Sequence, residues 1–90
     1  MPTDPPRFED LLEFPTDFTL RVIGAAGDLP ARAAERAERL LGRAVVGLDT
    51  AQSREGNWVV ARVTVRVESA PELRDLYALL HGLDGVRMVL

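Results

Sequence analysis

Two segments of the chain alternate apolar and polar residues with a period of two, the pattern of half-buried β-strands. The clearer segment covers residues 58–68, where valines and one alanine occupy every second position from Val59 onward. Residues 17–23 alternate in the same way, with Phe18, Leu20 and Val22 on one side. Each of these strands is therefore predicted to turn one face toward a core and the other toward solvent.

Two further strands are predicted from weaker patterns. One covers residues 43–50, and the polar loop at residues 52–57 would join it to the following strand as a long hairpin. The other covers residues 85–90, where Val86, Met88 and Leu90 alternate with Arg87 and Val89. We expect the first three of these side chains to face the core.

Between the strands lie two segments with helical spacing. In the first, Asp28 is the predicted N-cap, Pro30 stands in the first turn, and Gly42 is placed to end the helix. The apolar stripe of this helix consists of Leu29, Ala33, Ala37, Leu40 and Leu41.

The second helix is predicted to begin at a capping box formed by Ser69 and Glu72, each satisfying the other's backbone N–H. Its apolar side chains recur with helical spacing up to Leu80, and Gly82 ends it.

The order of these elements predicts an α+β fold of the ferredoxin-like type, βαββαβ. Right-handed crossovers would place two helices on one face of a four-stranded antiparallel sheet, with the first and third strands central. The other face of the sheet would be open. We assign residues 17–90 to this domain and residues 1–16 to an N-terminal tail with a short packed segment. The predicted core consists of Phe18, Leu20, Val22, Leu40, Val63, Val65, Leu76, Leu80 and Met88.

Composition narrows the class of protein. The 90 residues are 47% hydrophobic and 28% charged, an ordinary globular mixture. The sequence has no cysteine, and its first residues lack the pattern of a signal peptide, so we expect a cytoplasmic protein. Its apolar runs are too short to span a membrane. The net charge of −3 disfavours nucleic acid as a partner.

Residues that could carry chemistry are few. His81 is the single histidine and is placed in the last turn of a helix, where a structural or solvated role is favoured. Glu35 and Glu38 alternate with arginines and indicate an ion-paired helix face. The turn from Gly24 to Gly27 could hold an anion at a helix N-terminus, but it matches no phosphate-binding fingerprint. We therefore predict no catalytic residues, no metal and no cofactor.

The open sheet face is the candidate binding surface. On it the pattern gathers arginines from three adjacent strands, and these could bind carboxylates or phosphates. The alternative is a solvated face whose arginines pair with nearby acids. RNA is disfavoured because the central strands carry arginine and threonine where RNA-binding sheets carry aromatic residues. The candidate residues are Arg21, Trp58, Arg62, Arg66 and Arg87, with Thr19, Val60, Thr64 and Val89 around them.

Three short motifs resemble the YbeD-like family of small bacterial proteins. They are the segment from Leu11 to Phe18, the Gly56-Asn57 turn followed by an aromatic residue, and the final residues from Val86 to Leu90. The resemblance covers about residues 8–90. It implies a fold similar to the ACT-type regulatory domains, which bind small molecules at domain interfaces, and it implies no established activity and no site residues.

From these observations we expect a non-enzymatic regulatory or adaptor domain that binds another protein through the open sheet face or a dimer interface. The partner would be an acidic protein or a second copy of the chain. The alternative is an ACT-like sensor of a small anionic metabolite, bound in the strand–helix turn or between paired domains.

Overall fold

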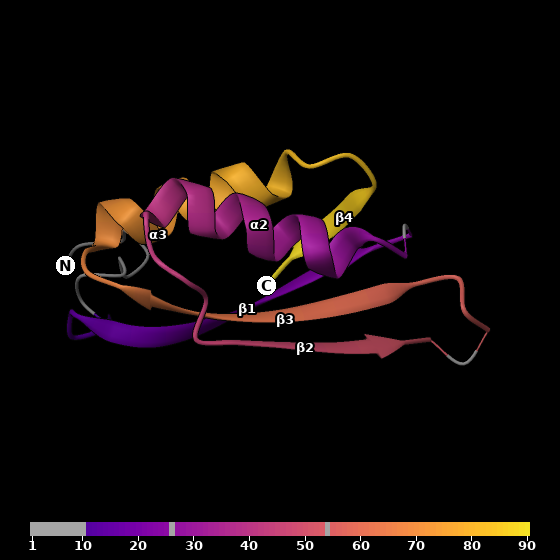
Figure 1. Ribbon diagram of the computed structural model, residues 1–90, viewed down its shortest axis with the longest axis horizontal. Helices are drawn as coiled ribbons and strands as arrows, with labels where there is room; N and C mark the ends of the chain where they lie inside the picture. The colour runs from indigo at the N-terminus through magenta and orange to yellow at the C-terminus, as the bar shows by residue number, and fades with distance from the viewer. Residues whose placement is uncertain (1–10, 26, 54) are drawn as a thin grey trace, which may run out of the picture.

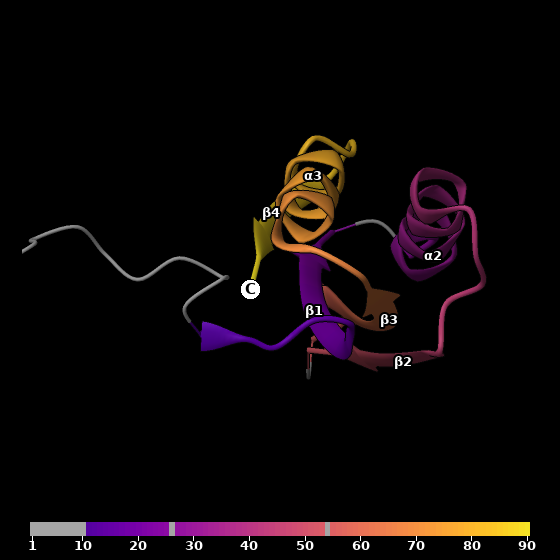
Figure 2. The same cartoon turned by 90° about the vertical axis from the view of Figure 1, so that its left-hand side faces the viewer.

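Four antiparallel strands form one sheet in the order β2–β3–β1–β4. The computed structural model describes residues 11–25, 27–53 and 55–90. The helices α2 and α3 lie side by side on one face of the sheet, and no described element covers the other face (Figures 1 and 2). The predicted ferredoxin-like α+β fold, with central first and third strands, is confirmed. The elements are β1 (Thr16–Gly24), α2 (Leu29–Leu41), β2 (Gly47–Gln52), β3 (Val59–Val67), α3 (Ala70–His81) and β4 (Val86–Val89).

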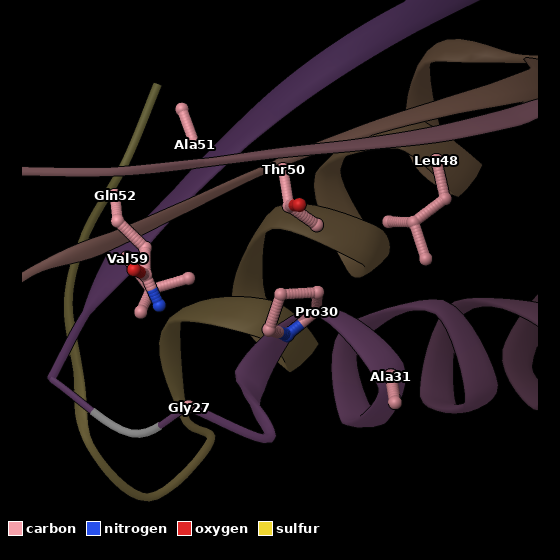
Figure 3. Close-up of a pocket in the computed structure, with 8 residues that line it drawn as sticks. All are labelled: Gly27, Pro30, Ala31, Leu48, Thr50, Ala51, Gln52 and Val59. Carbon is pink, nitrogen blue, oxygen red and sulfur yellow. The ribbon is translucent and has the colours of Figure 1, made fainter.

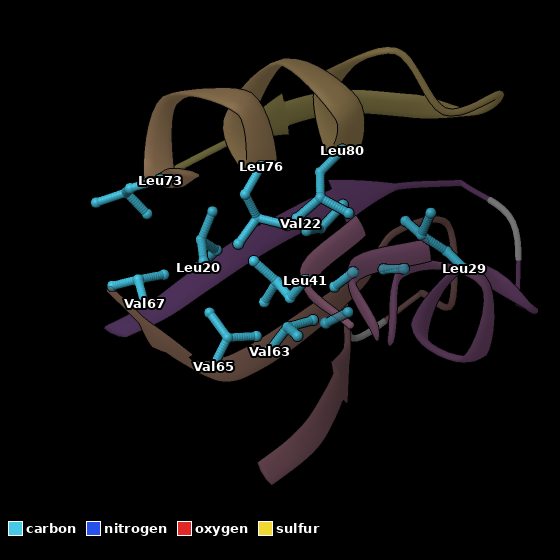
Figure 4. Close-up of a cluster of buried hydrophobic side chains, with 13 residues drawn as sticks. Leu20, Val22, Leu29, Leu41, Val63, Val65, Val67, Leu73, Leu76 and Leu80 are labelled. Carbon is cyan, nitrogen blue, oxygen red and sulfur yellow. The ribbon is translucent and has the colours of Figure 1, made fainter. Parts of the chain in front are cut away.

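The core fills the space between the helices and the sheet (Figure 4). The two central strands contribute alternate side chains to it, because successive residues of a strand point to opposite faces. Leucines of α3 and the alanine-rich stripe of α2 close it from above. Its members are Leu20, Val22, Leu29, Ala33, Ala37, Leu41, Ala61, Val63, Val65, Val67, Leu73, Leu76 and Leu80.

Two residues predicted to be in the core are exposed. Leu40 is 43% exposed, because the buried stripe of α2 follows the row of every fourth residue from Leu29 to Leu41 and leaves Leu40 beside it. Met88 is 48% exposed and lies on the open sheet face. Both predictions were wrong.

A β-bulge in β4 explains the position of Met88. Met88 pairs with Ile23, but Val86 pairs with Gly24, so Arg87 is an extra residue without a partner on β1. The side chains after the bulge change faces. Val89 therefore lies opposite Val22 and packs against the core, whereas the alternation had predicted Met88 and Leu90 there and Val89 on the open face.

The strand β2 begins later than predicted. The sequence placed it at residues 43–50, but it covers Gly47–Gln52. The residues before it form a connection in which the backbone N–H of Val45 donates to Glu38 Oε2 over 2.9 Å. This bond ties the connection to α2, and the N–H of Val46 already donates to the Thr64 oxygen of β3 over 2.7 Å.

The helix ends follow the predicted caps with two differences. Ser69 Oγ accepts from the Glu72 N–H, as predicted, but the Glu72 carboxylate accepts from the N–H of Glu68 and not from that of Ser69. Asp28 stands at the N-cap of α2 without a side-chain capping bond. Its Oδ2 lies 3.1 Å from Arg32 Nε instead. Gly42 ends α2 with a φ of 73°, in the left-handed region that glycine adopts without strain.

The segment before β1 packs against the domain in part. Within the segment predicted to pack, Leu12 and Phe14 contact the core, while Leu11 is mostly exposed. Phe8 and most of the predicted tail lie outside the described residues.

Candidate binding surface

The open sheet face is organised in rows that cross the strands. Cross-strand pairing places Ala51 opposite Val60, Val60 opposite Ile23, and Ile23 opposite Met88. Since each of these residues lies on the face away from the helices, they form one continuous apolar row across all four strands. We call these four residues the apolar row. Sequence analysis identified only Val60 among them, because Ile23 and Met88 follow from the pairing of β1 with β4.

The neighbouring row is charged. Asp49 pairs with Arg62, and Arg62 pairs with Arg21. Arg21 also exchanges two backbone hydrogen bonds of 2.8 and 2.9 Å with Leu90, which places Leu90 at the end of the same row. We call Asp49, Arg62, Arg21 and Leu90 the arginine row.

Two of the candidate arginines pair with aspartates on the same face. Arg62 Nη1 lies 3.1 Å from Asp49 Oδ2, and Arg66 Nη1 lies 3.5 Å from Asp17 Oδ1. All four side chains are substantially exposed, so these pairs contribute little to stability. Both aspartates were missed in the sequence. The strand register would have identified them, since each aspartate stands directly opposite its arginine.

The remaining two candidate arginines differ in their surroundings. Arg21 is exposed, and no acidic side chain within the described part of the chain forms an ion pair with it. The Arg87 guanidinium lies 5.8 Å from the centroid of the Trp58 ring, within the range of a cation–π contact. The four arginines therefore share a face, and among the described residues two of them have no acidic partner: Arg21 at the centre of the face and Arg87 over the Trp58 ring.

Exposed apolar side chains add to the apolar row. Trp58 is 41% exposed and Leu90 is 53% exposed. With Met88 they are three of the large hydrophobic side chains that the described residues leave open to solvent. The open face thus changes from apolar at the Trp58 end to charged in the middle, and then to the hydrogen-bonded hydroxyls of Thr19 and Thr64, whose oxygens lie 2.8 Å apart.

A groove on the helix side of the sheet is the second candidate site. It lies between β2 and the start of α2 and has a volume of about 590 Å³ (Figure 3). Among the described residues, its polar side chains, Thr50 and Gln52, are neutral, and none of those that line it is an arginine. It contains one end of the strand–helix turn where an anion was considered, yet none of the described residues that line it carries a positive charge. The lining residues are Gly27, Pro30, Ala31, Leu48, Thr50, Ala51, Gln52 and Val59.

The other residues considered for chemistry lie apart from one another. His81 is exposed in the last turn of α3. Glu35 accepts from Arg39 over 3.0 Å on the outside of α2, as its spacing indicated. Within residues 11–25, 27–53 and 55–90, no group of three or more histidine, aspartate or glutamate side chains is placed to hold a metal ion.

Burial affects one titratable group. Tyr77 on α3 packs edge-on against Phe18, with ring centroids 6.3 Å apart. Removal of water from the phenol raises the pKa of Tyr77 above its ordinary value. This contact lies on the core side of the sheet and takes no part in the open face.

No helix in the described part of the chain is both long and apolar enough to cross a membrane.

Solved structures support the fold. The solution structure of protein HP0495 from Helicobacter pylori superposes with a TM-score of 0.78 at 19% identity, covering 100% of this chain and 94% of that chain. The C-terminal domain of the MgtC protein from Mycobacterium tuberculosis superposes with a TM-score of 0.61 at 17% identity, covering 82% of each chain. At these identities the likeness concerns the fold alone.

Sequence relatives are closer. The UPF0250 protein IL0958 of Idiomarina loihiensis is 36% identical over 88 residues, covering 93% of this chain and 96% of the relative. A UPF0250 protein of Vibrio cholerae is 36% identical with 93% and 91% coverage, and one of Paraburkholderia phytofirmans is 33% identical with 91% and 94% coverage. The family model described as "Protein of unknown function (DUF493)" matches residues 9–90. The resemblance to the YbeD-like proteins is thereby confirmed, and this chain belongs to the DUF493 family, whose members include the bacterial UPF0250 proteins.

Proposed function

We propose that this protein is a non-enzymatic regulatory or adaptor domain of the cytoplasm, which acts by binding another protein through its open sheet face. The single observation that supports this most is the apolar row. Four adjacent strands carry it on the face that no described helix covers, next to the exposed side chains of Trp58 and Leu90. Exposed apolar surface bordered by polar residues is typical of protein interaction sites.

The composition of the surface supports a protein partner in a second way. Interfaces are enriched in tryptophan, methionine and arginine, and Trp58, Met88 and Arg87 occur together at one end of the open face. Trp58 is held by the Arg87 contact, so less side-chain freedom is lost when a partner covers the ring.

The alternative of a sensor for an anionic metabolite has less support. The described residues that line the groove beside α2 are neutral, and the nearby Asp28 carboxylate would repel an anion. Arg32 directly follows Ala31 of the groove lining, but its guanidinium is already paired with Asp28.

The proposal is tested by affinity capture from the native bacterium with a matched pair of variants. Met88→Lys places a charge in the apolar row, whereas Leu40→Lys changes a side chain of similar exposure on the helix side of the molecule. We expect Met88→Lys to lose proteins that the wild type and Leu40→Lys both retain. Equal capture by all three would contradict the proposal. A metabolite that raises the melting temperature of the wild type without any such capture would favour the sensor instead.

A further inference from the structure

We propose that the partner presents an acidic–apolar segment, whose carboxylate pairs with Arg21 while an adjacent aliphatic or aromatic side chain covers the apolar row. This inference rests on the proposed function and adds the chemistry of the partner to it.

Arg21 carries the first half of the inference. It lies on a central strand, and its cross-strand neighbours on the open face are Arg62 and Leu90. Neither of these side chains is acidic. Arg62 is itself paired with Asp49 over 3.1 Å, and like charges directly opposite each other on a sheet are unfavourable. A carboxylate of a partner protein would therefore offset the repulsion between Arg21 and Arg62. It could accept two parallel hydrogen bonds from the Arg21 guanidinium.

The net charge of the open face also favours an acidic partner. The strands place three arginines and two aspartates on it, and Arg87 adds a further cation over Trp58. Counted over these described side chains, the surface is net positive on a chain whose net charge is −3. The open face therefore attracts acidic groups although the molecule as a whole does not.

The spacing of the two rows specifies the geometry of the segment. Arg21 and Ile23 are two residues apart on β1, so the rows are separated by about 7 Å along the strand. An extended segment spans this with side chains at positions i and i+2, and a helix spans it with side chains at i and i+4. The partner would place its carboxylate and its apolar side chain at one of these spacings.

A second copy of the chain fits this surface less well. A two-fold symmetric pair joins the same patch on both subunits. Two open faces brought together would oppose two net positive surfaces, and the aspartates of each, Asp17 and Asp49, already pair with arginines of their own chain. Charge complementarity therefore favours a different, acidic protein.

A random peptide library displayed on phage is selected on the wild-type protein, and the selected peptides are synthesised and mapped by amide chemical shifts. We expect enriched peptides to combine Asp or Glu with Leu, Ile, Phe or Met, and to shift the amides of Arg21, Ile23, Val60 and Met88. Arg21→Gln should weaken their binding at least about tenfold, the loss that corresponds to one charge-assisted hydrogen bond. Arg36→Gln, on the exposed side of α2, should leave binding unchanged and serves as the matched control.

Several results would overturn the inference. These are selection of peptides without acidic residues, binding unaffected by Arg21→Gln, footprints confined to the groove beside α2, or a library that yields no open-face binder. Sedimentation that shows a dimer disrupted by Met88→Lys would identify a second copy as the occupant. Partner capture that depends on Met88 but not on Arg21 would overturn only the acidic character of the partner, whereas capture that depends on neither would overturn the proposed function as well.

Discussion

Arg43, the first residue after the Gly42 cap of α2, forms an ion pair with Glu72 in the first turn of α3. The same guanidinium donates to the backbone oxygen of Arg66 from Nε and Nη2, over 3.0 and 2.8 Å, and to that of Leu41 from Nη1 over 3.1 Å. One side chain thus connects the end of α2, the end of β3 and the start of α3. Both partners of the ion pair are half-buried, with side chains 30% and 25% exposed.

Arg43→Ala should lower the free energy of unfolding by about 2 kcal/mol, because it removes the ion pair with half-buried Glu72 and the side-chain donors to the backbone oxygens of Leu41 and Arg66. Arg39→Ala is the control. It removes an exposed ion pair with Glu35 and should cost less than about 0.5 kcal/mol. Urea unfolding of both variants measures the difference. Equal losses of unfolding free energy would show that Arg43 stabilises the fold no more than an exposed ion pair does.

Ser69→Ala should cost about 1 kcal/mol, since it removes the oxygen that accepts from the Glu72 N–H at the start of α3. Asp28→Ala is the comparison at α2, where the N-cap residue makes no side-chain capping bond, and it should cost less. Thermal or urea unfolding distinguishes the two. A neutral Ser69→Ala variant would mean that this cap does not stabilise α3.

Gly24→Ala should cost about 1–3 kcal/mol, because the new methyl group has no room. A Cβ at this position would lie 2.4 Å from the backbone oxygen of Gly85 and 2.8 Å from Leu29 Cδ2. The Gly85 oxygen also accepts from the Ala25 N–H, so a shift that makes room for the methyl group would break this hydrogen bond. Gly27→Ala meets no atom within 4 Å and should be nearly neutral. Similar unfolding midpoints for both variants would contradict the close approach of β1 and β4.

Val65→Asp should prevent folding, because Val65 is fully buried on a central strand and an aspartate there would be a charge without a partner. Met88→Lys should keep the fold, since Met88 lies on the open face. Circular dichroism and one-dimensional proton spectra of the two variants test the register directly. A Val65→Asp protein with the wild-type melting temperature would refute it.

Stability should fall at alkaline pH in a way that depends on Tyr77. Its pKa is raised above the ordinary value of 10.0 in the folded state, so the unfolded chain loses this proton first. The stabilisation is fully present below pH 10.0 and is lost as the pH rises through the folded-state pKa. Tyr77→Phe should remove this part of the decline, while it changes little between neutral pH and about pH 9. A pH series of unfolding midpoints that is identical for the two proteins would contradict it.

The sequence by itself determined the fold class, because the information is local. Alternation on the two central strands, apolar spacing on the two helices and the residues at their ends each depend on neighbours a few positions apart. The order of these elements then leaves few arrangements of the sheet, since crossovers are right-handed. The open face and the arginines on it followed from the same alternation.

Only the tertiary structure decided which residues meet on that face. The bulge at Arg87 moves Met88 and Leu90 to the open face and Val89 to the core, and residues 86–90 are apolar at too many positions for their alternation to reveal it. The pairing of Arg62 with Asp49 and of Arg66 with Asp17 depends on the register between strands, as does the position of Arg21 opposite Arg62. The physical reason is that a strand's own pattern fixes which side chains share its faces, whereas the neighbours across the sheet are set by backbone hydrogen bonds between segments that are distant in the sequence.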